Sequence, residues 1–242
     1  MGDTIHRSRF PNETPEYRSA RDALLRSEME LRRQLEAVAA ERRKLPLGGE
    51  VKEDYVFEEA DASGAPSTRS NRVRLSELFA PGQDTLIVYS YMFGPDMDEP
   101  CTSCTSILDG LEGEAPHVRD KVSFAVVAKS PLARIREVAR TRGWRNLRLL
   151  SSAGNGYNRD YHGENEDGDQ LPNLNVFVRR GGKVYHSYAT ELLFAPTEKG
   201  QDGRHVDLVW PLWNLFDYTP EGRGTKWYPR LSYEGKIGRA HV

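Results

Sequence analysis

The strongest constraint on this chain is a buried-type strand that leads to its only two cysteines. Residues 85–93 (TLIVYSYMF) are rich in β-branched and aromatic types and apolar on both faces, which predicts a central strand. Cys101 and Cys104 come soon after it. Two cysteines placed at random in this chain would fall three apart only about once in a hundred trials, so the spacing carries information.

We expect the two cysteines at the start of a helix. Residues three apart in a first turn share a face, so Cys104 can reach the sulfur of Cys101. The unpaired N–H groups and the positive end of the helix dipole favour a thiolate there over a thiol. We therefore predict a redox pair in which Cys101 attacks and Cys104 resolves the mixed disulfide.

The residues leave three other interpretations of the pair open. A structural zinc site needs four ligands, usually in two close pairs, but the only nearby histidine, His117, has no second Cys or His close to it. A peroxidatic thiolate is a second alternative, although no threonine lies three residues before either cysteine. In the third, both are small buried side chains without chemistry. We expect neither a metal nor a cofactor.

The loop that approaches the pair is acidic. Residues 94–100 (GPDMDEP) place the carboxylates of Asp96, Asp98 and Glu99 close to Cys101 in sequence. Negative charge opposes thiolate formation. Exposed carboxylates screened by salt would have little effect on the ionisation of Cys101, whereas carboxylates turned inward would leave its thiol protonated.

The elements around the pair alternate between strand and helix. From the cysteines onward we expect a short helix ending at Gly110 or Gly113, a strand over 122–128, a helix over 131–142 stopped by Gly143, and a strand over 147–150. This order implies βαβ units around a mostly parallel sheet.

Outside this alternating region, the sequence predicts further strands, turns and loops. We expect a strand over 54–59, a loop over 60–71, a helical turn over 76–79, a loop over 152–168, and a hairpin of strands 174–179 and 183–190. The C-terminal third has few clear periods. Its aromatic residues are typical of packing over a core, and they include Trp210, Trp213, Phe216 and Tyr218.

A long amphipathic helix is predicted from about Tyr17 to Arg43, a stretch without Gly or Pro. One narrow apolar seam runs along it, formed by Tyr17, Ala20, Leu24, Leu31, Leu35 and Val38. Packing of this seam on the protein's own core is favoured over a dimerising coiled coil, because fewer than four heptads are present. A homodimer remains an alternative.

Charge and hydropathy exclude several partners. The formal charge is −2, with 34 basic and 36 acidic residues, so no global field draws the chain to nucleic acid or an anionic membrane. The N-terminus has no apolar core of a secretory signal, and no stretch approaches the roughly 18 apolar residues of a membrane span. We expect a cytoplasmic protein.

Several segments together resemble a known family. These are residues 89–111 (YSYMFGPDMDEPCTSCTSILDGL), 122–135 (VSFAVVAKSPLARI), Gly143-Trp144 and 171–179 (LPNLNVFVR). They are similar to the uncharacterised bacterial family called domain of unknown function 899, which is grouped with thioredoxin-like proteins and predicted to be dithiol–disulfide oxidoreductases. The likeness runs from the N-terminal helix to about Tyr233.

The resemblance implies an α/β thioredoxin-like fold, with a central mixed sheet flanked by helices, a long N-terminal helix and an irregular C-terminal extension. It also implies that Pro172 forms a cis peptide bond facing the cysteine pair; the residues alone allow a proline that merely opens a strand. The expected parts are a helical extension over 1–50, a thioredoxin-like domain over 51–195, a C-terminal extension packed on the core over 196–236, and a non-native tail over 237–242.

Compared with thioredoxin itself, the predicted site departs in three ways. Thr102-Ser103 replaces Gly-Pro between the cysteines, Pro100 stands where an aromatic residue would precede the first cysteine, and the strand over 85–93 has no buried carboxylate. The hydroxyls of Thr102 and Ser103 can still donate hydrogen bonds to a thiolate.

Two functions follow as expectations. The first is a thiol–disulfide oxidoreductase acting on a protein or small-molecule thiol or disulfide. The alternative is a thioredoxin-like binding or scaffold protein whose cysteines are regulatory or not catalytic.

The last six residues, Ile237 to Val242, suggest a different origin. The sequence IGRAHV is a translation of ATC GGA AGA GCA CAC GTC, which looks like a short-read sequencing adapter. We therefore expect a non-native tail and assign His241 no function.

Overall fold

A computed structural model of the protein describes residues 5, 7–60, 70–193, 195–201, 208–222, 224 and 226–233. The chain divides into two compact units, residues 1–46 and residues 47–242. The predicted tail over 237–242 lies outside the described residues. No helix in the described part of the chain is long and apolar enough to cross a membrane.

The first unit is dominated by one long helix, α1 (Pro15–Arg42), as predicted. Thr14 caps it, because its hydroxyl accepts a hydrogen bond from the Tyr17 N–H at 3.2 Å, and Pro15 suits the first helical position. Several side chains of the apolar seam are exposed, Leu24 and Leu31 among them. The surface that meets this seam stays a prediction.

The second unit is built on a seven-stranded mixed sheet in the order β2-β1-β5-β4-β3-β6-β7. The strands are β1 (Val56–Ala60), β2 (Ser70–Arg74), β3 (Thr85–Tyr91), β4 (Ser123–Ala128), β5 (Leu149–Ser151), β6 (Asn173–Arg180) and β7 (Lys183–Ala189). The central strands β3, β4 and β5 are parallel, and the outer pairings are antiparallel. The predicted central mixed sheet is confirmed. The expectation that the sheet is mostly parallel is wrong, because only the β3–β4 and β4–β5 pairings are parallel and the later strands β6 and β7 join the sheet as an antiparallel hairpin.

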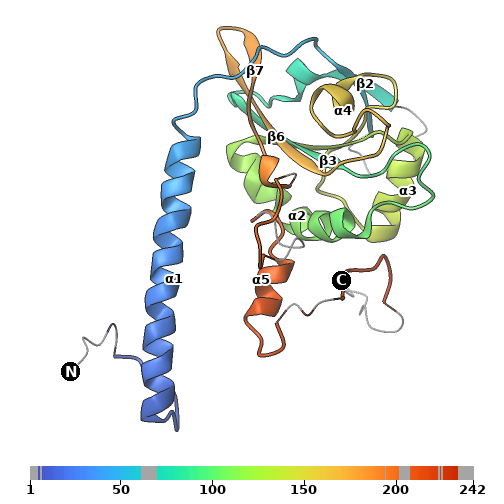
Figure 1. The fold of residues 1–242 in the computed structure, drawn as a ribbon. Helices are drawn as coiled ribbons and strands as arrows, with labels where there is room; N and C mark the ends of the chain where they lie inside the picture. Colours follow the sequence, from blue (N-terminus) through green and yellow to red (C-terminus); the bar gives the residue numbers. More distant parts are fainter. Residues whose placement is uncertain are drawn as a thin grey trace. The chain divides into compact units, whose positions relative to one another are not determined.

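Helices cover both faces of this sheet. The helices of this unit are α2 (Thr102–Lys121), α3 (Leu132–Arg142), α4 (Tyr157–Asp160), α5 (Leu212–Asp217) and the 3₁₀ turns η1 (Leu75–Leu78) and η2 (Glu191–Leu193), of which α2, α3, α4 and η1 contribute to the two buried clusters on the sheet. α2 and α3 pack on one face, and α4 and η1 on the other (Figure 1). Alternate residues of β3 point to the two buried clusters, Tyr89 to the first and Val88 to the second. The predicted thioredoxin-like fold, with the cysteine pair between a central strand and a flanking helix, is confirmed.

The helix after the cysteines is longer than predicted. α2 does not end at Gly110 or Gly113 but runs on through Pro116 to Lys121. Proline has no N–H, so the carbonyl of Glu112 one turn earlier loses its helical donor, and the Asn146 side chain donates to it instead at 3.3 Å. Tertiary packing thus overrides the helix-breaking residues.

Glu112 anchors this part of α2 a second time. Its carboxylate accepts hydrogen bonds from the backbone N–H groups of Arg145, Asn146 and Leu147, at 2.7 to 3.1 Å. These bonds tie the middle of α2 to the segment that enters β5, which explains why the helix continues where glycine would permit it to stop.

Two predicted loops contain regular structure. β2 takes up the end of the expected loop over 60–71, most of which lies outside the described residues, and α4 lies within the expected loop over 152–168. The β6–β7 hairpin is confirmed. Gly181 and Gly182 at its turn have φ of 57° and 79°, the left-handed values that a two-residue type I′ turn requires.

Gly143 and Gly113 should respond in opposite ways to alanine. Gly143 ends α3 with φ of 76°, so Gly143→Ala should lower the free energy of unfolding by about 1 kcal/mol. Gly113 is exposed inside α2 with open space around it, so Gly113→Ala should raise that energy by about 0.5–1 kcal/mol. Urea unfolding of both variants measures this, and effects of the same sign would contradict these helix boundaries.

Candidate active site at the cysteine pair

The structure places the cysteines where β3 gives way to α2. Cys101 is the N-cap residue of α2, and Cys104 lies in its first turn. The Cys101 N–H donates to the Met92 carbonyl at 3.0 Å, and the Cys101 carbonyl accepts from the Thr105 N–H at 2.9 Å. Cys101 is therefore bonded both to the chain that leaves β3 and to the helix that follows.

A series of hydrogen bonds between buried hydroxyls also holds Cys101. The Thr105 hydroxyl donates to the Cys101 carbonyl at 2.8 Å, so the Tyr91 hydroxyl, 2.8 Å from Thr105 Oγ1, is left as the donor to it. Tyr91 and Thr105 are both fully buried. Because Tyr91 belongs to β3, this chain ties the first turn of α2 to the central strand.

The two thiols have unequal surroundings. Both are free, with Cys101 half-buried and Cys104 only 2% exposed. The Cys104 thiol lowers the pKa of Cys101 to about 6, with further help from the N–H groups of Cys104 and Ser103 and the Ser103 hydroxyl, against the opposing effect of burial. The neighbouring Cys101 and burial hold the pKa of Cys104 well above its usual range. At neutral pH, Cys101 is thus the thiolate and Cys104 the thiol.

The acidic approach loop is turned outward. Asp96, Asp98 and Glu99 are all exposed, so solvent and salt screen their charge. The sequence allowed these carboxylates to be either exposed or turned inward. The structure has them exposed, so they oppose ionisation of Cys101 only weakly.

Arg134 of α3 holds this loop in place. Its guanidinium donates to the carbonyls of Gly94 at 3.3 Å, Pro95 at 2.9 Å and Asp98 at 3.1 Å, and also to that of Met97. The guanidinium lies 4.5 Å from the centre of the Phe93 ring, a cation–π contact. One side chain therefore fixes the backbone between β3 and Cys101.

The other predicted site residues lie close to the pair in sequence. Pro100, Thr102 and Ser103 are half-buried around the N-terminus of α2, and Ser103 is the one that contributes to the lowered pKa of Cys101.

Pro172 differs from its prediction, because the peptide bond before it is trans, like the other described ones. The cis prediction is therefore wrong. Pro172 precedes the Asn173–Ser90 pair that ends the β6–β3 ladder, a position that needs no N–H and suits an ordinary trans proline.

Sequence reasoning missed Arg134, Thr105 and the two tyrosines of β3, Tyr89 and Tyr91. Arg134 reads as a charged residue on the polar side of a helix, and the tyrosines as part of an apolar strand. A hydroxyl buried in a strand is a signal that can be found, because such a group needs a partner.

No group of three or more potential metal ligands occurs among the described His, Cys, Asp and Glu side chains. A separate cavity of about 1070 Å³ lies by β6 and β7, lined in part by Tyr161, Asn175 and His186. Neither cysteine lines it.

The lowered pKa of Cys101 can be measured by alkylation. With iodoacetamide, the rate should rise with pH through a midpoint of about 6, because only the thiolate reacts and Cys104 is buried and protonated. In Cys104→Ala the midpoint should move upward, because the largest contribution to the shift is gone. A wild-type midpoint near the ordinary value of about 8.5 would contradict the site geometry.

Loss of Arg134 should loosen the approach loop. Arg134→Met keeps an apolar contact with Phe93 but removes every donor, so the free energy of unfolding should fall by about 2 kcal/mol. Arg140→Met on the same helix breaks only an exposed pair with Glu137 and should change it by less than about 0.5 kcal/mol. Urea unfolding compares the two, and equal effects would rule out the anchoring role of Arg134.

Comparison with curated proteins gives no match. Among solved structures, the chain is similar to the reduced 2-Cys peroxiredoxin of Plasmodium vivax, with 13% identity over 59% of this chain and 83% of that chain and a TM-score of 0.44. AhpC of Enterococcus faecalis is 10% identical over 76% and 98%, with a TM-score of 0.44. The exposed lipoprotein thioredoxin Etrx1 of Streptococcus pneumoniae is 15% identical over 54% and 87%, with a TM-score of 0.37.

The comparison with family models is decisive. The model described as "Bacterial protein of unknown function (DUF899)" matches residues 7–234, which is nearly the whole chain. The protein therefore belongs to the DUF899 family.

Proposed function

We propose that the protein is a dithiol–disulfide oxidoreductase in which Cys101 is the nucleophile and Cys104 the resolving cysteine. The inequality of the two thiols carries the proposal. Cys101 is half-buried at the helix N-terminus with a pKa of about 6, whereas Cys104 is buried with a raised pKa. An attacking sulfur must be ionised and accessible to the substrate. A resolving sulfur must lie close to it but stay protonated and inaccessible until the mixed disulfide has formed.

The reaction proceeds in two exchanges. The Cys101 thiolate attacks one sulfur of a substrate disulfide, forms a mixed disulfide and expels the other substrate sulfur as a thiolate. Cys104 then loses its proton and attacks Cys101, which forms the Cys101–Cys104 bond and expels the second substrate sulfur. The substrate disulfide is reduced to two thiols, the protein dithiol is oxidised, and a thiol reductant restores it.

The class of substrate is a protein or small-molecule disulfide or, in the reverse direction, a dithiol. Both directions use the same two exchanges, since each step is reversible. A pKa of about 6 leaves Cys101 mostly ionised at neutral pH, and it also makes Cys101 a good leaving group when Cys104 or another thiolate attacks it.

Cysteine variants test the proposal. Cys104→Ser should accumulate a stable mixed disulfide with a small disulfide such as oxidised glutathione, because the first exchange remains and the second is lost. Cys101→Ser should form almost none, because the remaining thiol is buried and protonated. Mass spectrometry of the intact protein measures the adduct.

The wild-type protein serves as the control and should show a reversible internal disulfide, seen as a loss of two hydrogens. Mixed disulfides on both variants to the same extent, or a wild-type chain that never closes the bond, would contradict the proposal. Either result would favour a binding or scaffold protein with cysteines that do not catalyse exchange.

A further inference from the structure

Tyr89 of β3 has a buried hydroxyl without a partner. The residue is fully buried, and its Oη has no hydrogen-bond partner among the residues that the structure describes. Buried polar groups nearly always have one, because they lose hydration without compensation otherwise. Tyr91, two residues on and on the same face, follows this rule through Thr105. The Tyr89 hydroxyl is the exception that needs an explanation.

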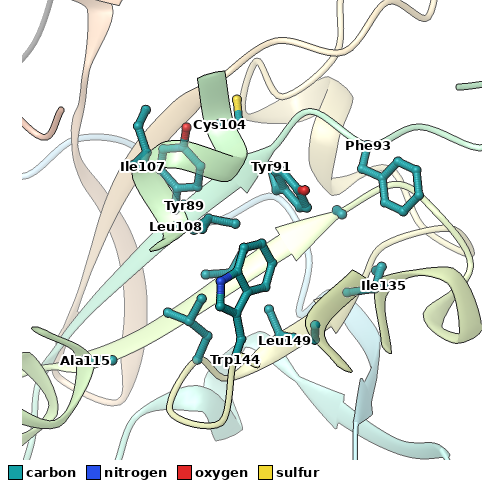
Figure 2. Close-up of a cluster of buried hydrophobic side chains, with 14 of the residues drawn as sticks. Tyr89, Tyr91, Phe93, Cys104, Ile107, Leu108, Ala115, Ile135, Trp144 and Leu149 are labelled. Atoms are coloured by element: carbon teal, nitrogen blue, oxygen red, sulfur yellow. The ribbon is translucent and has the colours of Figure 1, made fainter. Parts of the chain in front are cut away.

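The side chain of Tyr89 points toward the first turn of α2, where Cys104 lies (Figure 2). Both side chains belong to the same buried cluster. Burial and then the nearby Cys104 raise the pKa of Tyr89, while Tyr89 opposes the rise in the pKa of Cys104 that Cys101 and burial cause. The phenol and the resolving thiol thus lie in the same buried cluster of the core.

We propose that the Tyr89 hydroxyl donates a hydrogen bond to the Sγ of Cys104 when this sulfur becomes a thiolate, and so promotes the resolving step; this inference rests on the proposed oxidoreductase function. The step asks for a negative charge on a sulfur that is 2% exposed. A buried anion without a donor is strongly unfavourable. The unpaired buried hydroxyl of Tyr89, which points toward this part of α2 (Figure 2), is the group that can supply the donor.

Tyr89 can act as a donor but not as a base. Its pKa lies well above the ordinary value, so the phenol keeps its proton throughout the reaction. In the resolving step Cys104 gives its proton to solvent, its thiolate attacks Cys101 Sγ, the Cys101–Cys104 bond forms, and the Cys101–substrate bond breaks. The substrate sulfur leaves with the electron pair and takes up a proton from water. Tyr89 supports the thiolate and remains unchanged.

This assignment also accounts for the missing carboxylate in β3. A buried carboxylate could accept the proton of the resolving thiol directly, but β3 (TLIVYSY) has none. A phenol at position 89 stabilises the thiolate without accepting that proton. The rate of resolution should therefore rise with pH as solvent hydroxide removes the proton.

The test separates the two exchanges in time. Mixing the reduced protein with excess dithiobis(nitrobenzoate), an aromatic disulfide, releases one coloured thiolate when Cys101 attacks and a second when Cys104 resolves. In stopped-flow measurements the first phase depends on reagent concentration and the second does not. Tyr89→Phe should leave the first phase within about twofold and slow the second about tenfold or more, because a hydrogen bond to a charged group is lost. Its pH profile should shift to higher pH.

Tyr157→Phe is the matched control. Tyr157 is also fully buried and its hydroxyl has no hydrogen-bond partner among the described residues, but it lies on α4 in the cluster on the other face of the sheet. The control should leave both phases unchanged. Urea unfolding should show Tyr89→Phe at least as stable as wild type, because an unpaired buried hydroxyl is removed.

The outcomes are distinct. A wild-type protein without a second phase would sink the proposed function itself. A normal second phase in wild type that Tyr89→Phe matches would overturn the role of Tyr89 and leave the oxidoreductase standing. Equal slowing in both tyrosine variants, or slowing of both phases in Tyr89→Phe together with lower stability, would show a structural effect and also overturn it.

Discussion

The cysteine pair depends on the bonds that join the first turn of α2 to β3. The Tyr91 hydroxyl, the Thr105 hydroxyl and the Cys101 carbonyl form one buried chain from the strand to the helix cap. Because this chain fixes where the helix begins, it also fixes which N–H groups face the Cys101 sulfur. Those of Ser103 and Cys104 are among the groups that favour the thiolate. The packing of β3 in the core in this way sets which groups surround the Cys101 sulfur and so contributes to its lowered pKa.

The same geometry explains why an acidic loop can precede an ionised cysteine. Electrostatic interactions between exposed charges are screened within roughly 10 Å at 0.1 M salt, whereas contacts inside the core are screened much less. Arg134 binds the loop through backbone carbonyls, so the exposed side chains of Asp96 and Asp98 are not needed to hold it. The short-range donors around Cys101 therefore outweigh the carboxylates.

Local patterns in the sequence were sufficient for much of this fold. The apolar runs of β3 and β4, the two glycines of the β6–β7 turn and the stop at Gly143 each encode their structure within a few residues. Two of the misses, the end of α2 and the role of Arg134, involve partners distant in sequence. Pro116 is tolerated in α2 because the Asn146 side chain donates to the Glu112 carbonyl, which lacks its helical donor. The role of Arg134 depends on a loop about 40 residues away. Such contacts have no local period to read.

The site itself was predictable in part for the same reason. The spacing of Cys101 and Cys104 and their place after a buried strand are local features, whereas the inequality of their pKa values arises from burial and mutual contact. The ionisations of the two thiols are coupled, because the thiol of Cys104 stabilises the thiolate of Cys101 and is itself made harder to ionise. Stabilising the reduced pair in this way raises its reduction potential, by about 30 mV for each 1.4 kcal/mol. A pair with a raised reduction potential readily transfers its disulfide to a substrate dithiol. The resolving step requires a second buried sulfur to ionise, so this is the step at which the protein has to stabilise a charge.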